Sequence, residues 1–313
     1  MKLINVKKGK HNMAHDVFEF VNRNGEKVFG DKWLVENKAS KASIVLVHGM
    51  AEYAFRYDEF ARFLNDNNYD VYALDHIGHG RNCPNPKTLG IWPLDGFDRC
   101  VDNFTDVIDS LQKDGKEVYV FAHSMGSFMG QSFMERYPGK VKKIVLCGSS
   151  GPQFIHKMGK IVISLHVLGK KKTKPSKFLN SVAFGSYLSK TEEKTKNAWL
   201  SRNKENVDKY NKDSYCGFIP SLAFFKSFMA DGISKTHKKK NIKKIDKNQK
   251  VLLIVGQDDP VGNYSKSLFK LNDIYKGLGI ESNLIVYPKM RHEILNEDNK
   301  EDVMNDVLKF LEK

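Results

Sequence analysis

Cysteine is scarce in this 313-residue sequence, which contains only Cys83, Cys100, Cys147 and Cys216. The four stand far apart and form no C-x-x-C pair. This spacing excludes a disulfide-stapled miniprotein and argues against zinc ribbons and thiol redox motifs. We therefore expect reduced thiols in a cytoplasmic protein.

Long hydrophobic runs are also missing. No stretch approaches the roughly 18 consecutive apolar residues that a membrane-spanning helix needs. Residues 1–16 lack the apolar centre of a secretory signal peptide, so no cleaved signal is expected. Hydrophobic residues make up 41% and charged residues 28% of the chain, as is usual for a globular protein.

Acidic residues are rare in one segment. The whole chain carries a net charge of +14, yet residues 151–250 alone hold 23 basic and seven acidic side chains, a net charge of +16. A solvated lysine-rich surface is the simpler interpretation. The alternative is attraction to anionic lipid or to an acidic substrate. No nucleic-acid partner is expected, because no recognition motif accompanies the charge.

Short β-branched runs alternate with amphipathic helical patterns. The runs occupy residues 43–47, 71–74, 118–121, 144–146, 251–255 and 284–287, and the helical spacing is clearest at 57–64, 101–111 and 303–311. This alternation predicts an α/β fold with a mostly parallel, doubly wound sheet. Asn24-Gly25, between the runs at 17–21 and 27–35, predicts an antiparallel hairpin at the start.

The alternation stops near Ser150 and resumes at Val251. We therefore predict a core formed by residues 1–150 and 251–313, with residues 151–250 inserted between two strands as a basic helical cap. An apolar stripe at 154–168 is expected to pack on the core. Alternatively, this stripe and the apolar stretch at 222–229 form a lid surface that docks on anionic membranes.

Ser124 is the candidate nucleophile. It lies in the sequence Ala122-His123-Ser124-Met125-Gly126, after a predicted strand and before a predicted helix, which is the context of a nucleophile elbow. The two backbones pass close together at such a turn, so small residues are needed two positions to either side. Gly126 meets this need, whereas Ala122 adds a methyl group where glycine is usual.

The candidate acid and base follow the last two predicted strands. Asp258 and Asp259 come after the strand at 251–255, and His292 comes after the strand at 284–287. The order Ser124, Asp259, His292 is that of the α/β-hydrolases. His292 would take the proton of Ser124, and the aspartate would hold the imidazole in its working tautomer.

Two backbone N–H groups are candidates for stabilising an oxyanion. One is that of Met125, which follows the nucleophile, and the other is that of Met50, in the loop after the first buried strand. His48 in that loop is interpreted as a structural imidazole. Neither a metal nor a cofactor is expected, since the sequence has no clustered ligand motif.

These stretches resemble the monoacylglycerol lipase and lysophospholipase-like branch of the α/β-hydrolases, which includes serine aminopeptidase-like hydrolases. The matching motifs are the sequences at residues 48–57, 75–81, 123–126, 256–262 and 291–293, with further likeness at 183–185, 199–202 and 216–218. The resemblance implies an α/β-hydrolase fold with a cap, and it assigns the acid to Asp259 instead of Asp258. The chain departs from the family pattern at Met50, Asn82, Ala122 and Ser127.

The leading hypothesis is a serine hydrolase that cleaves single-chain lipid esters of the monoacylglycerol or lysophospholipid kind. A soluble short-chain esterase and a peptidase-like amide hydrolase, each with the same triad, remain alternatives. A catalytically silent binding module is a third. Peripheral contact with a membrane depends on the cap hypothesis, and the sequence leaves the oligomeric state open.

Overall fold

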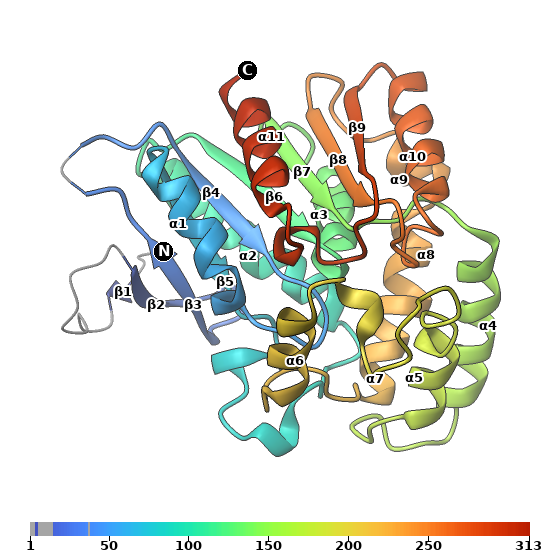
Figure 1. Ribbon diagram of the computed structural model, residues 1–313. Coiled ribbons are helices and arrows are strands. Elements are labelled where there is room, and N and C mark those ends of the chain that lie inside the picture. The colour runs from blue at the N-terminus through green and yellow to red at the C-terminus, as the bar shows by residue number, and fades with distance from the viewer. Residues whose placement is uncertain (1–3, 6–14, 37) are drawn as a thin grey trace.

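A computed structural model describes residues 4–5, 15–36 and 38–313. The prediction made for residues 1–16 lies mostly outside these residues. The described residues form one nine-stranded sheet with helices on both faces and a group of helices beyond one end of the strands (Figure 1).

The sheet has the strand order β1-β2-β3-β5-β4-β6-β7-β8-β9. The strands are β1 (Ile4–Asn5), β2 (His15–Val21), β3 (Lys27–Trp33), β4 (Ala42–Val47), β5 (Tyr69–Leu74), β6 (Val118–His123), β7 (Lys143–Cys147), β8 (Lys250–Gly256) and β9 (Glu281–Tyr287). All pairs from β5 across to β9 are parallel, whereas β1, β2 and β3 add antiparallel pairs at one edge. The predicted hairpin and the predicted mostly parallel sheet are both confirmed.

Helices cover the two faces of this sheet. On one face lie α1 (Asp58–Asp66) and α11 (Lys300–Glu312); on the other lie α2 (Gly96–Lys113), α3 (Met125–Arg136) and α10 (Lys266–Gly277). In β4, Val45 and Val47 point to the second face and Ile44 and Leu46 to the first, which explains why the strand is apolar throughout.

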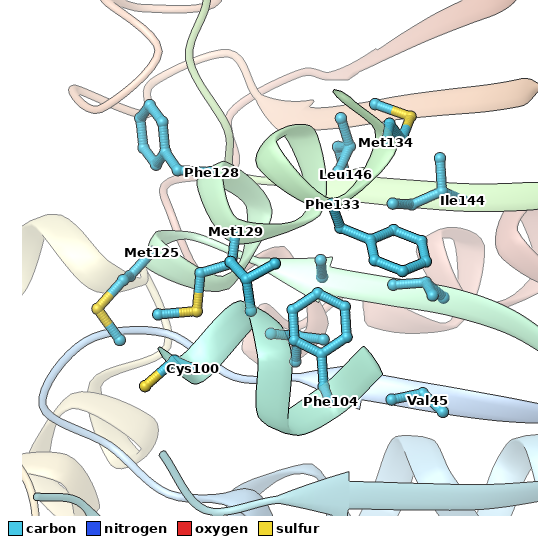
Figure 2. Packing of buried hydrophobic residues seen from close by; sticks show 14 of the residues in the cluster. Val45, Cys100, Phe104, Met125, Phe128, Met129, Phe133, Met134, Ile144 and Leu146 are labelled. Carbon is cyan, nitrogen blue, oxygen red and sulfur yellow. The ribbon is translucent and has the colours of Figure 1, made fainter. Parts of the chain in front are cut away.

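Aromatic and sulfur-containing side chains fill the space between the sheet, α2 and α3. The rings of Phe104 and Phe133 lie 5.3 Å apart between centroids, and Met129 extends into the same cluster (Figure 2). This packing fixes α3 against the sheet and thereby fixes the turn that precedes it.

Residues 151–250 lie between β7 and β8, and we call this segment the cap. Its helices are α4 (Phe154–Val167), α5 (Lys177–Phe184), α6 (Lys204–Lys212), α7 (Leu222–Phe224), a π-helix (Phe225–Gly232), α8 (Ile233–Thr236) and α9 (Lys239–Ile242). Short 3-10 helices occur at Ala54–Tyr57, Gly80–Asn82, Pro86–Thr88, Ala198–Leu200 and Ile294–Asn296. Helices α4 to α7 lie beyond the carboxyl ends of the parallel strands (Figure 1).

The apolar stripe of α4 does not pack on the core as expected. Phe154 is 76% exposed and Leu165 is 66% exposed, and most of the other large apolar side chains of this stripe are also exposed. Only Ile163 and Val167 of α4 are buried in the small cluster that the cap helices form. The helix carries apolar residues around more of its circumference than one neighbour can cover, so the other apolar side chains remain accessible to solvent.

The other apolar stretch, residues 222–229, behaves in the opposite way. Leu222, Phe224, Phe225 and Phe228 are all buried. The hypothesis that this stretch forms part of a lipid-facing surface is therefore wrong. In the described part of the chain, no helix combines the length and the apolar character needed to cross a membrane.

Candidate active site

The turn between β6 and α3 holds Ser124 in a strained conformation. Its backbone φ is 52° and its ψ is −120°, a combination that residues other than glycine rarely adopt. The N–H of Ser124 donates to the carbonyl of Cys147 at 2.9 Å, which ties the turn to β7. A Cβ at Gly126 would lie only 2.2 Å from the carbonyl oxygen of Val47, so no side chain fits at this position.

Ala122 is accommodated by a glycine that sequence reasoning missed. A Cβ placed on Gly130, in the middle of α3, would lie 3.2 Å from the Ala122 methyl and 2.9 Å from a methyl of Leu146. The helix therefore has no side chain at the point where Ala122 adds one. Glycine is unfavourable inside a helix, so its presence at position 130 was the available clue.

The three residues predicted as nucleophile, base and acid lie within hydrogen-bonding distance in series. The Ser124 hydroxyl donates to His292 Nε2 at 2.8 Å, and His292 Nδ1 donates to Asp259 Oδ2 at 2.9 Å. The second carboxylate oxygen of Asp259 accepts the N–H of Val261 at 2.9 Å. The structure thus brings together the ends of β6, β8 and β9 at one point.

The two neighbouring aspartates have different surroundings. Asp259 is 0% exposed and contacts the imidazole. The Asp258 side chain is 38% exposed and forms an ion pair with Arg202 of the cap at 2.7 Å. The structure therefore puts Asp259, and not Asp258, in contact with the imidazole, and it gives Asp258 a link to the cap.

His292 is buried beside a carboxylate. Burial disfavours its charged form, but the charge of Asp259 and the hydrogen bond to it outweigh burial and raise the pKa of His292 above its ordinary value. The ring is therefore well suited to accept a proton from Ser124.

The loop that carries Met50 lies against the nucleophile. A Cβ on Gly49 would approach the Cβ of Ser124 to 3.1 Å, and the Gly49 N–H is held by Glu52 Oε1 at 2.6 Å. The N–H of Met125 is at the first position of α3, where it has no partner within the helix. Among the hydrogen bonds of the described residues, none occupies the N–H of Met50.

His48 has the structural role predicted for it. Its Nδ1 donates to the Gly49 carbonyl at 2.8 Å, and its Nε2 accepts the N–H of His76 at 3.0 Å. His76 Nε2 in turn donates to the His48 carbonyl at 3.0 Å. Burial lowers the pKa of both rings, that of His76 to about 3, so the two stay neutral and fix the shape of the loop.

A buried polar network supports the site from behind. Arg56 contacts Glu52 at 2.5 Å and Glu293 at 2.9 Å, as well as stacking on Tyr210. Burial alone would raise the pKa of Glu52, but the charge of Arg56 and the hydrogen bond with His123 together keep that pKa below its usual range. Because Glu293 directly follows His292, this network links the start of the helix at Arg56 to the loop that carries the imidazole.

A cavity of about 600 Å³ lies above Ser124 and His292. Trp199 forms a wall beside His292, with ring centroids 5.1 Å apart, and Tyr187 packs on Trp199 at 4.9 Å. Most of the apolar lining comes from α4, α5, α3 and the π-helix and includes Phe128, Ile155, Met158, Val162, Ile163, Leu179, Val182, Ala183, Phe184, Phe228 and Met229. The sequence did not indicate which cap residues reach the cavity, because the stripe at 154–168 is apolar over much of the helix circumference and does not fix which side faces Ser124.

The family described as "Serine aminopeptidase, S33" matches residues 38–299. The chain is 29% identical over 206 residues to "Monoglyceride lipase" of Mus musculus, a match that spans 63% of this chain and 59% of that protein. It is 25% identical over 296 residues to "Monoacylglycerol lipase" of Mycolicibacterium smegmatis, covering 93% of this chain and 95% of that one.

Solved structures share the fold. A thermostable carboxyl esterase from Bacillus coagulans superposes with a TM-score of 0.87 at 22% identity, over 96% of this chain and 99% of that one. A soluble variant of monoglyceride lipase from Saccharomyces cerevisiae superposes with a TM-score of 0.74 at 17% identity, over 98% of each chain. These similarities establish the α/β-hydrolase fold.

Proposed function

The chain belongs to the serine aminopeptidase S33 family of α/β-hydrolases, and from this membership we propose that it hydrolyses carboxylic esters of single-chain lipids through Ser124. One observation carries the proposal. The hydrogen-bonded series of Ser124, His292 and Asp259 opens into a cavity of about 600 Å³ whose walls are mostly apolar.

The proposed reaction has two halves. Ser124 Oγ forms a bond to the ester carbonyl carbon while His292 Nε2 takes the hydroxyl proton, and the N–H groups of Met50 and Met125 stabilise the oxyanion. His292 then gives the proton to the departing alcohol oxygen as the ester C–O bond breaks. Water attacks the acyl-Ser124 by the same route and releases the fatty acid.

The cavity walls favour a long acyl chain over a short one. Each methylene group moved from water into an apolar site contributes about 0.8 kcal/mol. Turnover of dilute substrate should therefore increase with chain length until the apolar part of the cavity is filled. A short-chain esterase would show the opposite trend.

An amide-hydrolysing peptidase is less well supported. An enzyme that recognises a free α-amino group needs an available carboxylate in its substrate cavity. The carboxylates in the cavity wall are those of Glu52 and Glu293, and Arg56 pairs with both. Neither carboxylate is left to bind an ammonium group.

The cap gives this proposal a second part, namely docking on anionic membranes. The exposed apolar side of α4 has lysines at both ends. Residues 170–174 follow its carboxyl end, and His237, next to residues 238–240, stacks on His156 near its amino end at 5.4 Å. Apolar side chains flanked by basic ones are typical of surfaces that bind a lipid interface.

Labelling with a fluorophosphonate probe tests the nucleophile. Wild type should be labelled and Ser124→Ala should not. A panel of p-nitrophenyl esters of increasing chain length, run beside aminoacyl anilides, then tests the substrate class. Preference for anilides would favour the peptidase, preference for acetate the short-chain esterase, and absence of both labelling and turnover the binding module.

A further inference from the structure

Among the described residues, one charged side chain in the cavity wall has no ionic partner. Of the charged residues that line the cavity, Glu52 and Glu293 are both ion-paired with Arg56. The third is Lys190, which follows α5 in the cap. No ion pair within the described part of the chain includes Lys190.

The Lys190 ammonium is held above an aromatic ring. Its Nζ lies 3.8 Å from the centroid of the Tyr264 ring. Tyr264 belongs to three consecutive residues with left-handed backbone, Asn263, Tyr264 and Ser265, whose φ angles are 51°, 55° and 65°. Such a turn is unfavourable for residues with side chains, and here it places the Tyr264 ring in the cavity wall beneath the cation.

This pair lies on the side of the cavity where the catalytic base stands. The Tyr264 N–H donates to the carbonyl of Asp259 at 2.8 Å. Tyr187 also lines the cavity, and its pKa is raised mainly by burial, with a contribution from the charge of Asp259. Tyr187 also packs on Trp199, which contacts His292.

The reaction chemistry assigns a meaning to that side. In ester cleavage the proton for the leaving alcohol comes from His292 Nε2, so the headgroup of a lipid ester must lie beside this imidazole. The acyl chain then occupies the apolar walls formed by α4, α5 and the π-helix. A cation on the headgroup side would contact an anionic headgroup.

We propose that Lys190 selects substrates with an anionic, phosphate-bearing headgroup, so that the enzyme prefers an anionic lysophospholipid to an uncharged monoacylglycerol. The inference rests on the proposed ester hydrolysis and specifies its substrate class. Lys190 acts on specificity alone, because it does not touch the triad.

The test compares two esters with the same acyl chain and different headgroups. The substrates are 1-palmitoylglycerol and 1-palmitoylglycerol 3-phosphate, each presented in the same neutral detergent micelles. Wild type should show a higher kcat/KM for the phosphate. Lys190→Gln should lower kcat/KM for the phosphate by about three- to tenfold, mainly through KM, and should lower that for 1-palmitoylglycerol by a clearly smaller factor. Lys190→Glu should lower it further, and Lys190→Arg should retain it.

Lys177→Gln is the matched control, since it removes the same charge from α5 at a residue that does not line the cavity. Equal losses in Lys177→Gln and Lys190→Gln would show a general field effect and overturn the proposal. So would equal losses on both substrates. A third substrate, a monoglyceride whose acyl chain ends in a carboxylate, covers the remaining possibility. If Lys190→Gln affects only that ester, Lys190 faces the acyl end and the headgroup assignment is wrong.

The two levels of the proposal fail differently. If wild type hydrolyses neither palmitoyl ester, the proposed lipid esterase function fails. If it hydrolyses both and Lys190→Gln changes neither, only the headgroup inference fails.

Discussion

Two parts of the cap, the residues around α6 and the helix α4, differ in how they contact the core. Residues around α6 are tied to the loop that carries His292. Arg291 donates to the Ala198 carbonyl at 2.9 Å and to Glu193 at 2.6 Å, and the Glu293 N–H donates to the Leu200 carbonyl at 2.7 Å. Helix α4, by contrast, buries only Ile163 and Val167 and leaves the rest of its apolar surface exposed.

Under the proposed function, this difference separates two tasks within one segment. Acyl transfer needs His292 in a fixed position, because the donor and acceptor atoms must stay within hydrogen-bonding distance. Substrate entry needs a surface that accepts flexible chains and does not depend on one geometry. We therefore expect substitutions near the triad to abolish chemistry and substitutions on α4 to affect only access to lipid.

The largest expected effect is loss of the nucleophile or the base. Ser124→Ala and His292→Ala should each lower kcat by roughly 10⁴-fold or more, since the triad acts as a unit. Binding to vesicles, measured by co-sedimentation, should not change in either variant. If Ser124→Ala kept more than a tenth of wild-type turnover on every ester tested, the assignment of the nucleophile would be wrong.

The next effect concerns the acid. Asp259→Asn should lower kcat by roughly 10³-fold, because the amide cannot hold His292 in the tautomer that accepts the Ser124 proton. Asp258→Asn is the control and should stay within about threefold of wild type, since it loses only a half-exposed ion pair with Arg202. Equal losses in the two variants would move the acid by one residue.

A third prediction concerns acid stability. Burial lowers the pKa of His76 to about 3 and that of His79 to about 4, against 6.5 for a free imidazole. The unfolded chain therefore binds more protons than the folded chain between these values, and the free energy of unfolding falls as pH drops below 6.5. By pH 4 each ring should contribute a loss of roughly 3 kcal/mol.

Urea denaturation at pH 7.5, 6, 5 and 4 measures this loss. His292 has the opposite sign, because its folded pKa is raised and its contribution to stability is lost as pH rises. An unfolding free energy that stays constant from pH 6.5 to pH 4 would contradict the neutral, buried state of His76 and His79.

The sequence predicted the sheet and the triad better than it predicted the cap. The strands and the order of Ser124, Asp259 and His292 followed from patterns that the sheet imposes, since parallel strands end at one edge. The exposure of α4 did not follow, because a helix that is apolar over much of its circumference has the same sequence pattern whether or not a neighbour covers it. The contact between Lys190 and Tyr264 was not predicted, because it depends on a left-handed turn that no sequence motif indicates.

A fourth prediction tests whether the exposed side chains of α4 bind lipid without contributing to the stability of the fold. Phe154→Ser together with Leu165→Ser should weaken binding to vesicles by about tenfold, because both side chains would otherwise enter the lipid interface. The free energy of unfolding should change by less than about 0.5 kcal/mol, since both are exposed in the folded chain. Phe269→Ser, at a 54% exposed residue of α10, is the control and should leave vesicle binding unchanged.

The smallest expected effect comes from the lysines at residues 238–240, which follow His237, the residue that stacks on His156 near the amino end of α4. Replacing Lys238, Lys239 and Lys240 with glutamine should weaken binding to anionic vesicles by about five- to tenfold. A lysine close to an anionic surface contributes roughly 1 kcal/mol, and the lysines further away are screened beyond about 10 Å at 0.1 M salt. Hydrolysis of a short soluble ester should not change, because none of the three lines the cavity.

A matched triple variant distinguishes position from net charge. Lys38, Lys87 and Lys113 are exposed on the part of the chain outside the cap. They take part in no ion pair recorded for the described residues. Their replacement with glutamine removes the same charge away from the cap and should leave vesicle binding within about twofold of wild type. Binding should also rise with the anionic lipid content and fall at high salt. If both triple variants lose affinity equally, the position of the cap lysines does not matter. If lipid charge and salt have no effect, these lysines are only a solvated surface, and any binding of α4 to lipid depends on its apolar side chains alone.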